Sequence, residues 1–146
     1  MKKLYILLFA LSTSFYTSAQ IKISDFDDAK IYFDGVFNSY SEDSGIDEYG
    51  NIYIDMGSAS SGRHYFRITD VNLSIEEKPE EPGCADICPP RVIISFKCRK
   101  SVCLQDPTIQ GTGYIEGAIV FENIARGKKA FEFLKAFREF VLKSIE

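Results

Sequence analysis

The spacing of apolar residues predicts a helix near each end of the chain. Residues 24–40 place apolar side chains at intervals of three and four, with acidic and amide side chains opposite, which is the pattern of an amphipathic helix. Ser24 is a suitable N-cap for this helix, and Asp27 follows three residues later. Residues 128–144 show the same spacing with a wider apolar arc, so we expect the second helix to pack across a sheet.

Between these helices, the alternation of apolar and polar residues predicts about six strands. The clearest is residues 91–98, in which Val92, Ile94 and Phe96 share one face. The charged, proline-containing segment 76–83 is unsuited to a central strand. The pattern predicts an α+β fold with an N-terminal helix, a mainly antiparallel sheet of about six strands, and a C-terminal helix packed on the sheet. The other strands are expected at 51–56, 63–69, 71–77, 102–104 and 114–122.

The first nineteen residues have the pattern of a secretory signal peptide. Lys2 and Lys3 form a basic start, residues 4–11 are apolar, and residues 17–19 are small residues of the kind that precede a cleavage site. The apolar run is shorter than the roughly 20 residues that span a bilayer, so we expect cleavage and no membrane anchor, with a retained anchor as the alternative. The expected mature chain, residues 20–146, is one α+β domain that is periplasmic or secreted.

The four cysteines lie in two pairs, and the second pair suggests a stapled hairpin. If the chain reverses at residues 100–101, Cys98 and Cys103 come directly opposite each other, within the range of a disulfide bond. We expect Cys84 and Cys88 to form the other bond, with the crossed connectivity still open. Four zinc thiolates are the alternative, but export favours disulfides.

The charge of the chain limits the kinds of partner. Its formal net charge is −4, and removal of Lys2 and Lys3 makes it −6. A nucleic-acid-binding protein needs a basic surface, so we expect no nucleic-acid partner. An acidic chain can bind a basic protein or a divalent cation, and acidity also increases solubility.

His64 is the only histidine in the chain, which excludes a histidine-based triad and a multi-histidine metal site. We expect it to be a surface or half-buried residue of a strand. The sequence also lacks the motifs of nucleophile-elbow serine hydrolases, zinc proteases and phosphate-binding loops. We therefore expect no catalytic residue, no metal site and no cofactor.

Glu42, Asp43, Asp47 and Glu48 make the segment between the first helix and the first strand acidic. Carboxylate oxygens are calcium ligands, but the spacing differs from that of a calcium-binding loop. A solvated loop is the favoured interpretation, and cation binding stays open. Carboxylates in this region are also the basis of an alternative function, a small hydrolase.

The chain contains twelve phenylalanines and eight tyrosines, and the helix and strand faces account for most of them as core residues. Tyr32, Tyr49, Tyr53 and Tyr65 are the candidates for an exposed patch that binds a partner. The sequence thus predicts a non-enzymatic exported binding protein whose ligand is another protein. An immunity-type inhibitor of a toxin or hydrolase and a small carboxylate-dependent hydrolase are the alternatives.

The segment I-S-F-K-C-R-K-S-V-C at 94–103 and the terminal G-K-K-A-F-E-F-L-K-A-F-R-E-F helix at 127–140 resemble those of small exported bacterial proteins without an assigned activity. The order of strands and one amphipathic helix over residues 51–145 also resembles a pleckstrin-homology-like domain. This resemblance implies a scaffold for binding and supplies no site residue. The connection G-S-A-S-S-G at 57–62 lacks the basic residues of the lipid-binding members.

Overall fold

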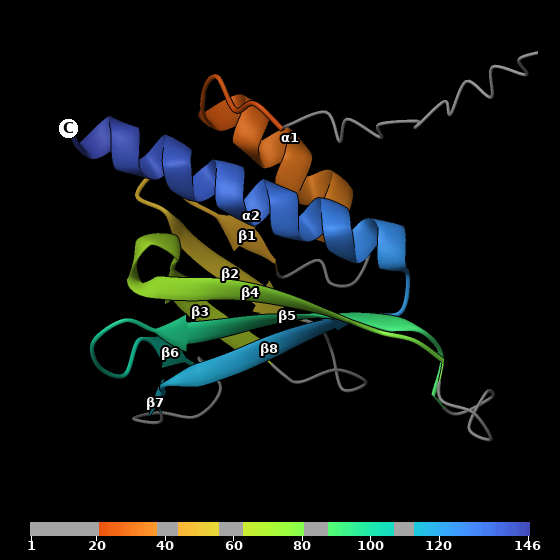
Figure 1. The fold of residues 1–146 in the computed structure, drawn as a ribbon. Coiled ribbons are helices and arrows are strands. Elements are labelled where there is room, and N and C mark those ends of the chain that lie inside the picture. Colours follow the sequence, from red (N-terminus) through yellow and green to blue (C-terminus); the bar gives the residue numbers. More distant parts are fainter. Residues whose placement is uncertain (1–20, 38–43, 56–62, 81–87, 107–112) are drawn as a thin grey trace, which may run out of the picture.

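The computed structural model describes residues 21–37, 44–55, 63–80, 88–106 and 113–146. The fold is α+β, as predicted, with two helices and two antiparallel sheets. Figure 1 shows both helices on one side of the strands, with the longer helix running across them. The predicted signal peptide lies outside the described residues.

The two helices are those that the apolar spacing predicts, with different ends. α1 spans Phe26–Phe37, and α2 spans Ile124–Ile145. The sequence pattern starts the second helix at residue 128, whereas α2 starts four residues earlier, at Ile124. Asn123 is the N-cap of α2, because its side-chain Oδ1 accepts a hydrogen bond of 2.9 Å from the backbone nitrogen of Arg126.

The predicted antiparallel sheet is divided into two sheets. β1, β2, β3, β6 and β7 form the larger sheet in that order, and β4, β5 and β8 form the smaller one. A short 3-10 helix, η1, spans Ile68–Asp70 between β3 and β4. The strands are β1 (Gly45–Ile46), β2 (Asn51–Asp55), β3 (Arg63–Arg67), β4 (Val71–Lys78), β5 (Arg91–Cys98), β6 (Leu104–Gln105), β7 (Gly113–Tyr114) and β8 (Glu116–Phe121).

Three stretches of chain pass from one sheet into the other. β3 leads through η1 into β4, β5 leads into β6, and β7 leads into β8. The three stretches keep the same order in both sheets. β3, β6 and β7 are neighbours in the larger sheet, and their continuations β4, β5 and β8 are neighbours in the smaller one. The molecule therefore contains three long antiparallel strands that all bend in one region. We call this region, residues 68–70, 99–103 and 115, the corner.

The predicted hairpin with a reversal at residues 100–101 is wrong. β5 pairs with β4 and β8, whereas β6 pairs with β3 and β7, so β5 and β6 are not paired with each other. The chain does not return along β5 after residue 98 but continues into the other sheet. Exposed, polar residues at 99–101 are typical of a hairpin turn, and here they belong to a bend within one long strand.

One core joins both helices and both sheets. Phe133 of α2 packs against Phe33 and Phe37 of α1, with ring centroids 6.0 Å and 6.3 Å apart. Phe66 of the larger sheet packs against Phe96 of the smaller sheet, with ring centroids 4.6 Å apart. The two layers therefore depend on each other for burial of their aromatic side chains.

Glycine allows close approach at the first turn of α2. An ideal Cβ on Gly127 would lie 2.7 Å from the Cβ of Val92 and 3.1 Å from the Cβ of Phe121. Both neighbours belong to buried strands, so neither can move freely. A side chain at residue 127 would push α2 away from the smaller sheet.

We predict that Gly127→Ala lowers the free energy of unfolding by about 1–3 kcal/mol, the usual cost of overpacking. Gly35→Ala is the matched control, because Gly35 is an exposed residue of α1 with no atom within 4 Å of an added Cβ. The control should be neutral or more stable by up to about 1 kcal/mol, owing to helix propensity. Urea unfolding of both variants measures the difference, and equal effects would contradict the close contact.

Candidate functional site

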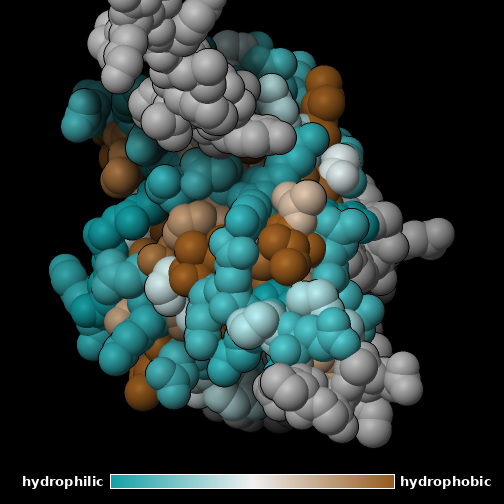
Figure 2. Space-filling view, turned by 45° about the vertical axis from the view of Figure 1, so that its right-hand side comes forward, coloured by the Kyte–Doolittle hydropathy of each residue, from teal (hydrophilic) through white to brown (hydrophobic). Residues whose placement is uncertain are grey.

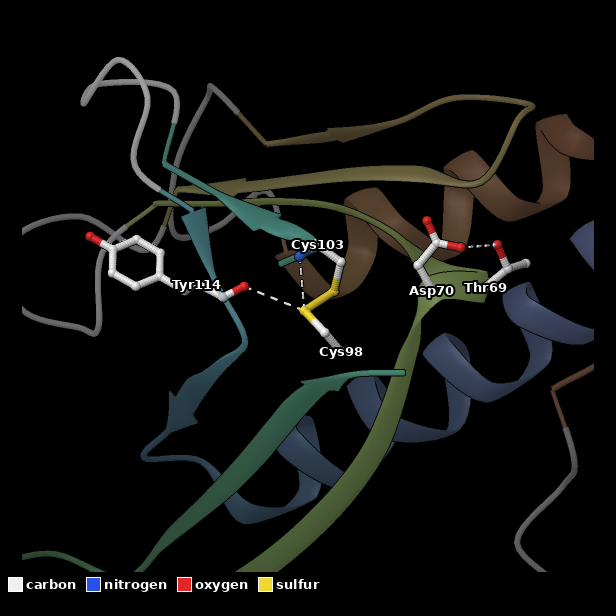
Figure 3. Close-up of a disulfide and its surroundings, with 5 residues drawn as sticks. All are labelled: Thr69, Asp70, Cys98, Cys103 and Tyr114. Atoms are coloured by element: carbon white, nitrogen blue, oxygen red, sulfur yellow. Dashed lines mark hydrogen bonds between the residues drawn. A yellow bond between two sulfur atoms is a disulfide. The ribbon is translucent and has the colours of Figure 1, made fainter. Parts of the chain in front are cut away.

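The Cys98–Cys103 disulfide closes a short excursion of the chain at the corner. The two Cα atoms are 5.6 Å apart. The backbone nitrogen of Cys98 donates a hydrogen bond to the carbonyl of Ile115 (2.8 Å), and that of Cys103 donates to the carbonyl of Tyr114 (3.3 Å). Figure 3 shows the bond beside the strand that carries Tyr114. Both ends of the excursion are therefore fixed on consecutive residues of the neighbouring strand.

The pairing register explains why the chain projects here. Lys97 pairs with Glu116 before the corner, and Leu104 pairs with Tyr114 after it. Residues 98–103 thus lie opposite a single residue, Ile115. The surplus residues 99–102 cannot fit in the ladder and must project from it. We call residues 99–102 the corner loop.

The structure settles part of the predicted cysteine pairing. With Cys98 bonded to Cys103, the crossed connectivity is excluded. Cys88 is also disulfide-bonded, so three of the four cysteines are not zinc thiolates. Cys84, and with it the expected Cys84–Cys88 pairing, lies outside the described residues. Disulfide bonds persist in oxidising compartments, which indicates that the protein works in one.

Polar contacts hold the corner loop against η1. The backbone nitrogen of Arg99 donates to the carbonyl of Asp70 (2.9 Å), and its side-chain Nε donates to Oδ1 of Asn72 (3.2 Å). The hydroxyl of Thr69 donates to Oδ1 of Asp70 at 3.3 Å, as Figure 3 shows. The loop is thus fixed to both neighbouring strands, by the backbone nitrogens of Cys98 and Cys103 on one side and by Arg99 on the other.

A pocket of about 580 Å³ lies between the corner loop and the strand that contains η1. We call it the corner pocket. The residues that matter for its chemistry are basic, aromatic or apolar, with one carboxylate: Tyr65, Arg67, Asp70, Arg99, Lys100 and Val102.

Exposed apolar side chains gather around the corner pocket. Val102 and Tyr65 line it, with 55% and 38% of their surface exposed. Tyr114 and Ile115, whose carbonyls accept hydrogen bonds from Cys103 and Cys98, are 43% and 58% exposed but are not part of the pocket lining. An ideal Cβ on Gly113 would lie 2.2 Å from Cγ1 of Val102, so this glycine allows Val102 to lie against the neighbouring strand. Figure 2 shows a face of the molecule on which apolar surface comes in separate areas surrounded by hydrophilic side chains.

The structure brings some of the four predicted tyrosines together. Tyr53 and Tyr65 are directly paired on β2 and β3, and Tyr65 lines the corner pocket. Tyr49 is 64% exposed, and its carbonyl accepts a hydrogen bond of 3.0 Å from Nε of Arg67. Tyr32 lies on α1, half-buried against the core. The sequence missed Arg67 and the corner loop, although the excess of basic residues at 97–100 was a signal for the loop.

His64 is buried, in contrast to the surface or half-buried position expected from the sequence. It lies on the inner face of β3, with its ring centroid 6.0 Å from that of Phe96. Its Nε2 lies 3.1 Å from the carbonyl oxygen of Ala118 on β8, so it bridges the two sheets. Burial lowers the pKa of His64, while the Ala118 carbonyl and the nearby Asp106 carboxylate act in the opposite direction.

Asp47 and Asp55 both have structural contacts. Oδ1 of Asp47 accepts hydrogen bonds from the backbone nitrogens of Tyr49 (2.9 Å) and Asn51 (3.0 Å), which shapes the turn before β2. Asp55 is the only buried acidic residue in the described part, and its carboxylate lies 2.6 Å from Nε of Arg63. Glu42 and Asp43 of the predicted acidic loop lie outside the described residues, so the solvated loop stays a prediction.

Comparison of the chain with protein-family models, with curated proteins and with solved structures finds no match. The resemblance to pleckstrin-homology-like domains therefore stays a prediction. Neither described helix, including the 22-residue α2, has an apolar stretch long enough to cross a membrane. The function must be inferred from the geometry of the chain itself.

We predict that the double variant Cys98→Ser/Cys103→Ser lowers the free energy of unfolding by about 2 kcal/mol, because the bond closes a short loop. Lys100→Ala, inside the same loop but outside the bond, should change it by less than about 0.5 kcal/mol. Urea unfolding under non-reducing conditions measures both. A double variant as stable as the control would show that the disulfide does not stabilise the corner.

His64 should make stability depend on pH. Since its pKa is lowered in the folded state, the unfolded chain takes up the proton first as pH falls. Its contribution is therefore complete above about pH 6.5, the usual histidine pKa, and is lost as pH falls through the lowered folded value. We expect His64→Gln, which keeps a donor for Ala118 but does not titrate, to reduce this loss.

The measurement is the urea midpoint of wild type and His64→Gln between about pH 8 and pH 5, above the range in which ordinary carboxylates titrate. The single histidine makes the comparison specific. Parallel curves for the two proteins would contradict a buried, neutral His64.

Proposed function

We propose that the protein is a non-enzymatic exported binding protein whose ligand is another protein. The observation that carries the proposal is the outer face of β2 and β3 together with the corner loop. This surface presents Tyr53, Tyr65, Arg67 and the exposed Val102 next to one another. Tyrosine and arginine are the residues enriched at the centres of protein–protein interfaces.

The rigidity of this surface supports recognition. Tyr65 is fixed in the sheet by pairing with Tyr53 and Gln105 on its two sides, and the corner loop is closed by the disulfide. A surface that is already ordered loses little conformational entropy on binding. The disulfide also supports work in the periplasm or outside the cell, where such bonds are stable.

The alternatives receive less support from the described residues. A carboxylate-dependent hydrolase needs two carboxylates in one cleft, whereas the one buried carboxylate, Asp55, lies against Arg63. An immunity-type inhibitor of a basic toxin would need an acidic surface, and the corner pocket carries Arg67, Arg99 and Lys100. A partner whose contact surface is not basic is therefore the better proposal.

The test is recovery of the exported protein without reductant, followed by native mass spectrometry. We expect a stoichiometric complex with one cognate protein for the wild type. The triple variant Tyr49→Ala/Tyr53→Ala/Tyr65→Ala should weaken this complex by roughly tenfold or more, since truncated interface aromatics each cost about 1–2 kcal/mol. Ile31→Ala is the control, because Ile31 is 70% exposed but lies on α1.

Absence of a stoichiometric protein partner would contradict the proposed function. Full binding by the triple variant would show that the partner uses another surface. Both results require that each variant unfolds in urea with a wild-type midpoint, which separates lost contacts from lost structure.

A further inference from the structure

We propose that the corner pocket binds an acidic segment of the protein partner, with aspartate or glutamate side chains held by Arg67, Arg99 and Lys100. This inference rests on the proposed function and adds the chemistry of the partner. It follows from three features of the described residues: the charge of the pocket, the orientation of its two guanidinium groups, and the apolar side chains beside it.

The charge of the pocket is opposite to that of the chain. The chain has a formal net charge of −4, yet three cations and one carboxylate, Asp70, line the pocket. Asp70 already accepts a hydrogen bond from Thr69. No described residue forms a salt bridge with Arg67, Arg99 or Lys100. The pocket thus keeps a positive charge that a carboxylate from outside can neutralise.

Both guanidinium groups are held through Nε. Nε of Arg67 donates to the carbonyl of Tyr49 at 3.0 Å, and Nε of Arg99 donates to Oδ1 of Asn72 at 3.2 Å. Among the described residues, the terminal nitrogens of these two side chains have no hydrogen-bond partner. A guanidinium that is fixed at Nε presents its two terminal nitrogens as a pair, the geometry that receives both oxygens of one carboxylate.

The surroundings favour a protein segment over a free small anion. Tyr65 and Val102 are exposed within the pocket lining. A free anion would leave these side chains in water, whereas an acidic segment with apolar neighbours would bury them. Charge complementarity and apolar contact therefore point to the same occupant.

The disulfide makes the pocket a pre-formed site. It fixes the ends of the corner loop, and the backbone bond from Arg99 to Asp70 fixes its start. Without the disulfide, Lys100 and Val102 would lose their position relative to Arg67. Binding of an acidic segment should therefore be weaker after loss of the bond, even though the bond itself touches no carboxylate.

The probe for the test is a synthetic peptide of five glutamates around one leucine, titrated into 15N-labelled full-length mature protein. We expect shifts of the backbone amides of residues 65–70 and 98–105. Arg67→Gln/Arg99→Gln should weaken binding by roughly tenfold or more, because the variant loses both the charge and the paired nitrogens that hold the peptide carboxylates. Arg67→Lys/Arg99→Lys, which keeps the charge without the paired nitrogens, should bind at an intermediate level.

The matched control is Lys97→Gln/Lys129→Gln, which removes the same charge from exposed residues outside the pocket lining. It should keep nearly the affinity of the wild type. Equal weakening in both double variants would overturn the proposal, since it would indicate only long-range electrostatic attraction. Shifts confined to other residues would also overturn it, as would inorganic phosphate that binds at the same amides as tightly as the peptide.

The outcome is distinguishable from failure of the proposed function. If the native complex forms and Arg67→Gln/Arg99→Gln does not weaken it, the acidic-segment inference is wrong and the binding function stands. If the peptide binds at the corner but no protein partner is found in native mass spectra, the chemistry of the pocket stands and the proposed function is wrong.

Discussion

The bend that carries three strands from one sheet into the other is the constraint on which the rest of the structure depends. It turns the inner faces of the two sheets toward each other, so that Phe66 and Phe96 pack with ring centroids 4.6 Å apart. A bend breaks strand ladders, and unpaired backbone groups are costly. Here the carbonyls of Asp70, Tyr114 and Ile115 accept from the loop residues. Residues 99–102, which have no place in the strand ladder at the bend, form the corner loop. The candidate site therefore exists because the strands bend here.

The same strand builds the core and the site. Along β3, His64 and Phe66 point inward while Tyr65 and Arg67 are exposed, as the period of a strand requires. His64 reaches the carbonyl of Ala118 in the smaller sheet at 3.1 Å. The close approach depends on Gly117, since a Cβ there would lie 3.0 Å from Cε1 of His64. Because the inward residues fix the angle between the sheets, they also set where the outward residues lie relative to the corner loop.

Sequence periodicity predicts the helices and most strands here because each element buries one face. It does not predict the corner, because apolar alternation is the same whether a strand ends in a turn or bends into a second sheet. Residues 99–101 are polar in either case, which is why a hairpin was expected. The apolar spacing starts the second helix just after Gly127, whereas this glycine lies inside α2, where Val92 leaves no room for a side chain. Arg67 and Arg99 both line the pocket. They are far apart in the sequence, and only the pairing of the strands brings them together.

The local charge of the corner matters more for recognition than the net charge of the chain. Long-range electrostatic attraction depends on the net charge of the chain, which is negative. A bound segment interacts mainly with the charged groups within one Debye length, about 8–10 Å at physiological salt. Among the residues that line the corner pocket, Arg67, Arg99 and Lys100 outnumber Asp70. The Cys98–Cys103 bond closes the loop that carries Arg99 and Lys100, and this bond requires an oxidising environment. The proposed site is therefore closed only where the disulfide can form, so the compartment that the disulfide indicates and the proposed ligand chemistry depend on the same bond.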